Sequence, residues 1–481
     1  MSENTSVNSP TSPSEPPPPN NAPVTPSPVP QPTRGIVKQS PFKFIAPVVV
    51  ILIVLGIIFF GITKILQPKL PKTNNQSQGN TSIESTEIEY WGLWEPSIML
   101  DEIFAEFEST NPGTKIKYIQ QSPQDYRKRL SNALASDKGP DVFRFHVTWG
   151  VMLDQYLSTL PESIMSKSEF DQTFYPVAQE WLQSPGGYIG VPLMHDGLGL
   201  FYNRTIFDSA GITPPSTWEE LRDLANKLTI KNEQGQIQQA GIALGGTKNV
   251  DHWSDILGLM MLQNAADPTK PNNNLGQTAV DYYLLFRKDG VWDDSMAPST
   301  FAFASEKTAM IIAPTWRAHE ILAINPNIKF SIAKTPTLPG IDISWATFWA
   351  EGVSRKSSNS KQQASWQLLS YLSSKDVMRK LYTAAAQQER LFGAPFSRVD
   401  LADQLVGDPF VGSVIDQASV SKTWYMNSRT FDDGINDKII KYYEDALNLI
   451  LYDAQPTDKA LETAESGIQQ ILNPQPVPQT K

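Results

Sequence analysis

Two short apolar runs, residues 188–193 and 198–202, have the length and boundaries of buried strands. Between them lies a polar corner formed by His195, Asp196 and Gly197. Glycine relaxes the backbone at such a corner. Two strands joined in this way can serve as a crossover between two lobes, with the polar residues facing a ligand between the lobes. An ordinary turn with a solvated aspartate fits the same local pattern.

From residue 88 onward, strand-like and helix-like periodicities alternate along the chain. Strands are expected at residues 88–91, 115–120 and 141–145, and helices at 98–107 and 126–136. This alternation predicts an α/β fold with a largely parallel sheet covered by helices on both faces. Because ligands collect beyond the carboxyl ends of the strands in open sheets of this type, the loops at 91–95 and 144–149 are candidate binding loops.

The same alternation continues after the corner. Ser216-Thr217-Trp218-Glu219 is interpreted as a capping box that opens a helix at 218–228. Further strands are expected at 240–244, 308–313, 329–334 and 345–351, and further helices at 252–263, 363–372, 377–386, 435–451 and 458–472. The chain shows no internal repeat.

The first 85 residues have a different character. Residues 1–42 are rich in Pro, Ser, Thr and Asn and are predicted to be a disordered arm, more simply a spacer than a ligand for a polyproline-binding module. Residues 43–66 contain an unbroken apolar run, predicted to be an uncleaved transmembrane anchor helix. Residues 67–85 are a polar tether, and 473–481 a flexible tail. Lysines and arginines flank both ends of the anchor, so charge alone gives no orientation.

Length, charge and composition narrow the functional classes. A chain of 481 residues exceeds what one core usually supports, so two lobes are expected. A net charge of -10 argues against nucleic acid and, more weakly, against a strongly anionic ligand. The absence of cysteine excludes disulfides, thiolate metal sites and a lipidated cysteine. The four histidines show no metal-ligand spacing, so neither a metal nor a cofactor is expected. Twelve tryptophans require an explanation beyond core packing.

Several separate blocks resemble the extracellular solute-binding proteins of ABC importers, in the carbohydrate-binding group that includes maltose-binding protein. The blocks are Tyr90-Trp91-Gly92-Leu93-Trp94, Phe107-Glu108-Ser109-Thr110-Asn111-Pro112-Gly113, Gly139-Pro140-Asp141-Val142, Gly190-Val191-Pro192-Leu193, Leu200-Phe201-Tyr202-Asn203, Pro215-Ser216-Thr217-Trp218-Glu219-Glu220-Leu221, and Pro314-Thr315-Trp316. Each block alone is weak, and their order and spacing over residues 86–472 make the resemblance specific.

The resemblance implies a two-lobed periplasmic-binding-protein-like fold of type II that closes over its ligand. The first lobe would comprise 86–194 and 353–405, and the second 195–352 and 406–472. His195-Asp196 would be one crossover and Glu351-Gly352 another. The lobes would lie outside the cell and the N-terminus in the cytoplasm. Members of this family are usually secreted or tethered by a lipidated cysteine, so the anchor helix is a departure from the pattern.

Carried over residue by residue, the resemblance places a carbohydrate site between the lobes. Such a site combines aromatic platforms for the apolar faces of sugars with fixed polar groups for their hydroxyls. Trp253 and Trp349 fit either the cleft or the core, and the alignment at Trp424 and Tyr425 is loose. The candidate ligand-binding residues are Trp94, Glu95, Arg144, Phe145, Thr148, Trp149, His195, Asp196, Trp253, Trp316, Trp349, Trp424 and Tyr425.

The implied function is non-enzymatic capture of an oligosaccharide or polyol and its delivery to an ABC-type permease. One alternative is a surface receptor or adhesin for glycans without transport. A less favoured alternative is a glycoside hydrolase, for which Glu95 and Asp196 would be the paired carboxylates.

Overall fold

The computed structural model describes residues 85–387 and 393–473, all of which belong to one unit, Ser82–Lys481. The predicted arm, the anchor helix, the tether up to residue 84 and the tail from residue 474 lie outside the described residues. Among the helices that are described, none has both the length and the apolar character needed to cross a bilayer.

The first of two large sheets has five strands in the order β2-β1-β3-β13-β6. Strands β2 (Thr114–Gln120), β1 (Thr86–Gly92) and β3 (Val142–His146) are parallel. Strand β13 (Trp349–Val353) runs antiparallel to β3, and β6 (Val191–Pro192) runs antiparallel to β13. Since β1 and β3 are parallel neighbours, their carboxyl ends meet at one edge, as the sequence predicted.

The second sheet has seven strands in the order β14-β12-β7-β10-β9-β8, with β11 also paired to β7. The strands are β14 (Ser421–Lys422), β12 (Ser344–Thr347), β7 (Asp196–Asn203), β10 (Thr308–Pro314), β9 (Ile237–Ile242), β8 (Ile230–Lys231) and β11 (Phe330–Ala333). Strand β7 is antiparallel to β10, β11 and β12, so this sheet is mixed rather than largely parallel. A small hairpin, β4 (Gln183–Ser184) with β5 (Gly187–Tyr188), stands apart from both sheets.

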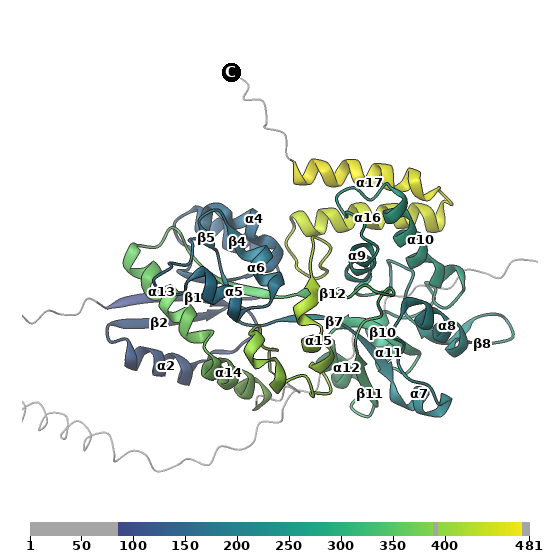
Figure 1. The fold of residues 1–481 in the computed structure, drawn as a ribbon, viewed down its shortest axis with the longest axis horizontal. Coiled ribbons are helices and arrows are strands. Elements are labelled where there is room, and N and C mark those ends of the chain that lie inside the picture. The colour runs from purple at the N-terminus through teal and green to yellow at the C-terminus, as the bar shows by residue number, and fades with distance from the viewer. Residues whose placement is uncertain (1–84, 388–392, 474–481) are drawn as a thin grey trace, which may run out of the picture. The chain divides into compact units, whose positions relative to one another are not determined.

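Helices cover the two sheets (Figure 1). Those around the first sheet are α2 (Asp101–Thr110), α3 (Tyr126–Ala135), α4 (Gly150–Leu153), α5 (Lys167–Thr173), α6 (Pro176–Leu182), α13 (Asn359–Leu372) and α14 (Lys375–Gln387). Those around the second are α7 (Arg204–Ala210), α8 (Trp218–Leu228), α9 (Trp253–Gln263), α10 (Asn274–Lys288), α11 (Ser299–Ala304), α12 (Arg317–Ile324), α15 (Gly412–Asp416), α16 (Ile435–Tyr452) and α17 (Thr457–Leu472). Short 3-10 turns are η1 (Ser97–Met99), η2 (Val147–Trp149), η3 (Asp154–Tyr156), η4 (Val399–Gln404) and η5 (Ala418–Val420).

The capping box of α8 lies one residue later than predicted. The helix spans Trp218–Leu228 as expected, but its N-cap is Thr217, whose hydroxyl accepts from the Glu220 backbone N–H. The Glu220 carboxylate in turn accepts from the backbone N–H groups of Ser216 and Thr217. Ser216 and Glu219 have the same three-residue spacing, but the helix begins at Trp218, so its N-cap is Thr217 and its third residue is Glu220.

The chain crosses between the two sheets at neighbouring positions. It leaves the first sheet after β6 and enters the second at Asp196, and it returns between Thr347 and Trp349. The return therefore comes before Glu351-Gly352, because Glu351 already pairs with Arg144 and Val191 in the first sheet. The two crossovers lie side by side and connect two hydrophobic cores, one for each sheet. We call each sheet with its helices and core a lobe.

Candidate functional site

The loop that follows β1 is held by side chains from β2. The Tyr118 hydroxyl donates to the Glu95 carbonyl at 2.7 Å, and the Gln120 side-chain amide donates to the Leu93 carbonyl at 3.2 Å. Gly92 allows this approach, since a Cβ there would lie 2.2 Å from the Tyr118 hydroxyl. The sequence 93–95 is thereby fixed at the carboxyl end of β1, where it carries Trp94 and Glu95.

Three indole rings and one imidazole gather at this strand edge. The Trp349 ring contacts Trp94, Trp149 and His146, with centroid distances of 5.0, 4.9 and 5.2 Å and near-perpendicular planes. Trp149 is fully buried, Trp349 is partly exposed and Trp94 is 38% exposed. Edge-to-face packing of this kind is favourable for aromatic rings. These four residues form what we call the aromatic cluster, and it presents Trp94 and Trp349 to solvent.

A buried ion triad lies beneath the cluster. Arg144 donates from Nε to Glu351 Oε1 and from Nη1 to Glu95 Oε2, both at 2.6 Å, and its guanidinium lies 5.5 Å from the centre of the Trp94 ring. Burial opposes the charge on Arg144, but the two carboxylates outweigh it and raise the pKa of Arg144. Burial raises the pKa of Glu351, although Arg144 acts against this. The triad joins three elements: the β1 loop, β3 and the returning strand β13.

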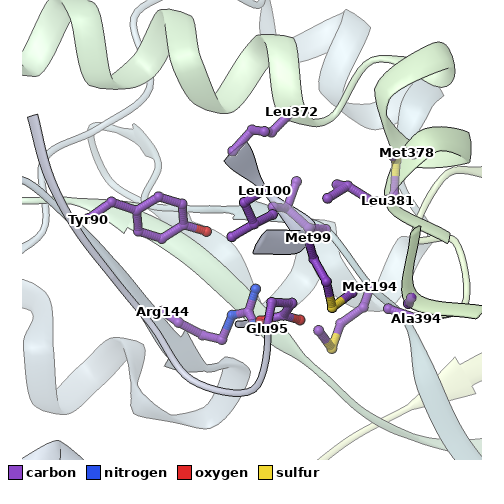
Figure 2. Close-up of a pocket in the computed structure, with 12 residues that line it drawn as sticks. Tyr90, Glu95, Met99, Leu100, Arg144, Met194, Leu372, Met378, Leu381 and Ala394 are labelled. Atoms are coloured by element: carbon purple, nitrogen blue, oxygen red, sulfur yellow. Dashed lines mark hydrogen bonds and ion pairs between the residues drawn. The ribbon is translucent and has the colours of Figure 1, made fainter. Parts of the chain in front are cut away.

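A cavity of about 40 Å³ adjoins the triad. Figure 2 shows Tyr90, Glu95 and Arg144 at one side of it and apolar side chains around the rest. The apolar wall includes Met99, Leu100, Met194, Leu372, Met378 and Leu381. Sites for small organic ligands usually span hundreds of cubic ångströms, so this cavity is too small for a sugar ring.

On the second lobe, Asp196 anchors the turn that follows β10. Its Oδ1 accepts from the Thr315 hydroxyl at 2.8 Å and from the backbone N–H groups of Thr315 and Gly197, and its Oδ2 accepts from the Trp316 N–H at 3.4 Å. Asp196 is only 8% exposed, so it is not a solvated turn residue. Burial raises its pKa to about 6, while the hydrogen bonds act in the opposite direction. Asp196 therefore fixes the position of Trp316.

Asp196→Asn is expected to remove a dependence of stability on pH. Between the ordinary pKa of 3.8 and the folded pKa of about 6, the folded state retains a proton that the unfolded state has lost. Wild-type stability therefore falls as the pH rises through this interval, by about 3 kcal/mol at ~1.4 kcal/mol per pKa unit. Asparagine keeps an acceptor oxygen and does not titrate. In urea unfolding at pH 4, 5, 6 and 7, the free energy of unfolding of the variant should increase relative to that of wild type up to pH 6. A difference that stays constant with pH would contradict this.

The crossovers connect the aromatic cluster to the Trp316 turn. His146 Nε2 lies 3.2 Å from the Thr347 hydroxyl, and Thr347 pairs with Asp196 across β12 and β7. Burial lowers the pKa of His146 to about 3, so its ring is neutral at pH 7. A continuous chain of contacts thus runs from Trp349 through His146, Thr347 and Asp196 to Trp316.

A polar network supports Trp316 from behind. The guanidinium of the buried Arg317 lies 4.5 Å from the Trp316 ring centre, and its Nε donates to His252 Nε2 at 2.9 Å. Since that nitrogen accepts, the neutral His252 ring carries its proton on Nδ1, which lies 2.8 Å from the Ser428 hydroxyl. Burial lowers the pKa of His252 and Arg317 lowers it further, although Asp255 opposes them. Arg317 thus covers one face of the Trp316 indole.

The other predicted site residues do not all reach this surface. Phe145 is fully buried in the first core, and Trp253 is 8% exposed and packs in the second core. His195 is 2% exposed at the crossover, where burial lowers its pKa to about 3. Thr148 is buried and bonded to His146 and Asn436. Trp424 and Tyr425 are partly buried, and Tyr425 contacts Trp181 rather than the aromatic cluster, with a centroid distance of 5.2 Å.

Sequence reasoning missed Glu351, Thr315 and Thr347. Thr315 directly precedes a predicted stacking tryptophan, so the sequence could have indicated that Thr315 lies in the turn. The family resemblance places Glu351 only at a crossover. A carboxylate within an apolar strand signals a buried partner, because an unpaired charge there is costly. In the described part of the chain, no group of three His, Asp or Glu side chains is arranged to hold a metal ion.

Comparison with known proteins gives a consistent result. A family model described as bacterial extracellular solute-binding protein matches residues 95–379. The multiple sugar-binding protein of Streptococcus mutans is 24% identical over 350 residues, which cover 68% of this chain and 79% of that protein.

Solved structures share the fold. The cyclic alpha-maltosyl-1,6-maltose binding protein of Arthrobacter globiformis superposes with a TM-score of 0.67 at 16% identity, covering 81% of this chain and 99% of that one. The maltose/maltodextrin-binding domain of Bdellovibrio bacteriovorus, bound to maltotriose, gives a TM-score of 0.58 at 18% identity, with 80% and 100% coverage.

Proposed function

Because the chain belongs to the family of bacterial extracellular solute-binding proteins, we propose that it captures a carbohydrate, an oligosaccharide or polyol, between its two lobes. The observation that carries this is the set of partly exposed indole rings of Trp94, Trp349 and Trp316. Trp94 and Trp316 follow the carboxyl ends of β1 and β10, and Trp349 begins β13 opposite the carboxyl end of β3. Indole faces bind the apolar faces of sugars. The sugar ligands in the names of the matched relatives support the same class.

The contacts of Glu95 and Asp196 support binding of the carbohydrate without its hydrolysis. A glycoside hydrolase would need one carboxyl group to protonate the leaving group and another to attack or to activate water. Glu95 is bound to Arg144 at 2.6 Å, and Asp196 accepts four hydrogen bonds from its own chain. Both groups are engaged in holding the site together. The test is incubation of the protein with glycans: release of reducing ends, lost in Asp196→Asn, would favour the hydrolase.

The proposal extends to transport. Residues 43–66 anchor the chain in the cell membrane, with the N-terminal arm in the cytoplasm and the lobes outside. Domain closure on the ligand shifts the population toward a form that docks on an ABC-type permease. A surface receptor or adhesin for glycans is the alternative, and it would be favoured if the neighbouring genes encode no permease.

The direct test is a thermal-shift screen of the purified full chain against mono- and oligosaccharides, beginning with maltotriose. A ligand that binds only the folded state raises the melting temperature. A shift that saturates with concentration and is confirmed by calorimetry would support capture. The absence of any shift across the panel would contradict it.

Trp316→Ala is expected to weaken the affinity for the bound glycan by about 1–3 kcal/mol, because one stacking platform is lost. The backbone of the turn remains bonded to Asp196, so the fold should change little. Calorimetry measures the effect, and Trp316→Phe, which keeps an aromatic ring, serves as the control. Equal affinity of the alanine variant and wild type would remove Trp316 from the site.

A further inference from the structure

The loop 428–434, which precedes α16, has an unusual backbone. Three of its residues other than glycine are left-handed, Arg429, Phe431 and Asp433, with φ of 59°, 51° and 44°. This region is disfavoured for residues with a Cβ, and a bulky residue is rarely found there. Phe431 is nevertheless 47% exposed, so burial of its ring does not compensate for the conformation.

Contacts from the second lobe hold the start of the loop. The Ser428 N–H donates to both carboxylate oxygens of Asp255 at 3.2 Å, and the Arg429 guanidinium pairs with Asp251 at 3.1 Å. Burial favours the protonated form of Asp251, but bonds from Thr300 and the charge of Arg317 lower its pKa to about 2. Asp251 is therefore ionised at neutral pH, and its ion pair with Arg429 holds the start of the loop.

Contacts from the first lobe hold its end. Arg127 on α3 donates to the carbonyl oxygen of Asp432, and the Asn436 amide donates to the Thr148 hydroxyl at 2.6 Å. The Asp432 carboxylate accepts from the backbone N–H groups of Gly434 and Asn436. The backbone at Phe431 is thus fixed from both lobes, and this keeps it in a disfavoured conformation.

The same anchors place the loop beside both halves of the candidate site. Ser428 is bonded to His252, whose ring lies 5.7 Å from that of Trp316. At the other end, Thr148 is bonded to His146 of the aromatic cluster at 2.8 Å. The loop therefore spans from the Trp316 turn to the aromatic cluster, with an exposed phenyl ring between its two anchored ends.

We propose that Phe431 is a further aromatic contact for the captured carbohydrate. An exposed ring in a disfavoured backbone conformation costs stability in the free protein, and stacking on the apolar face of a sugar offsets that cost only in the complex. Because the loop is held by both lobes, the ring is in place only when the lobes are arranged as they are here. This inference rests on the proposed function.

A glycine substitution distinguishes an effect on binding from an effect on folding, because glycine adopts the left-handed conformation without strain. Phe431→Gly relieves the left-handed conformation, so it is expected to raise the melting temperature by about 1–4 °C while weakening maltotriose binding at least about tenfold. Asp433→Gly is the matched control: it relieves the same strain in the same loop and should leave the affinity unchanged. Phe431→Leu keeps an apolar side chain without a ring and should also weaken binding.

Unchanged affinity in both Phe431→Gly and Phe431→Leu would overturn the inference and leave the proposed function intact. If glycine lowers both the melting temperature and the affinity, Phe431 is structural, and the inference also fails. If wild type binds neither maltotriose nor any other sugar of the panel, the proposed function fails and the inference fails with it.

Discussion

Replacing Arg144 with methionine is expected to destabilise the fold by about 3–5 kcal/mol. The side chain is 5% exposed and forms the only ion pairs that Glu351 and Glu95 have in the described chain. Glu351 is 1% exposed, so without Arg144 its charge would be buried and unpaired. Urea unfolding at pH 7 measures the loss. Because Arg144 also lies against Trp94, glycan affinity should fall as well.

Two further measurements show whether the unpaired charge of Glu351 causes the loss of stability in Arg144→Met. Arg144→Met combined with Glu351→Gln should recover much of the loss, since neither residue then carries a charge. In the single variant the pKa of Glu351 should rise further. A group with a raised folded pKa loses stability as the pH rises, so the deficit of Arg144→Met should shrink as the pH is lowered from 7. An equal deficit at every pH, with no recovery in the double variant, would instead indicate a packing defect.

Periodicity predicted most elements because most of them are determined locally. Helices α8, α9, α16 and α17 lie within two residues of their predicted bounds, since their apolar stripes and breakers are within the segments themselves. The expected strand at 345–351 is in fact two strands, β12 and β13, which belong to different sheets. No local pattern shows this change of sheet, because the apolar residues from Trp345 to Ala350 are interrupted only by Thr347.

Only part of the candidate site could be predicted from the local sequence. The carboxyl-end rule brought Trp94 and Arg144 together, because parallel strand order makes the ends of β1 and β3 meet. The local sequence pattern could not distinguish the exposure of Trp349, which is partly exposed, from that of Trp149, which is buried beneath it. That difference arises from ring packing between residues 200 positions apart. The roles of Asp196 and Glu351 also depend on partners distant in sequence, Thr315 and Arg144.

The same contacts give the ion triad and the Asp196 turn a positioning role in the candidate site. Arg144 and Asp196 form hydrogen bonds with other groups of the chain, and each of them fixes a loop that carries a partly exposed indole. A site preorganised in this way loses less conformational freedom when it binds. Affinity should therefore depend on residues beneath the surface as well as on the rings.

Trp349→Ala is expected to weaken glycan affinity by about 2–4 kcal/mol, more than any other single ring. Trp349 is itself partly exposed, and it also supports Trp94, Trp149 and His146 at about 5 Å. Its loss removes one platform and leaves Trp94 without the ring that holds it. Calorimetry with the glycan identified in the thermal-shift screen measures the change, and urea unfolding separates it from any loss of stability.

Trp91→Ala provides the matched control for this experiment. Trp91 is also a partly buried indole on the first sheet, but its Nε1 donates to Glu89, and within the described part of the chain it makes no ring contact with the aromatic cluster. Its replacement should lower stability to a similar degree and leave affinity within about twofold of wild type. If both variants lose affinity equally, the effect reflects general loosening of the first lobe, and Trp349 has no special place in the site. If only Trp349→Ala weakens binding, the cluster is the platform on which the sugar lies.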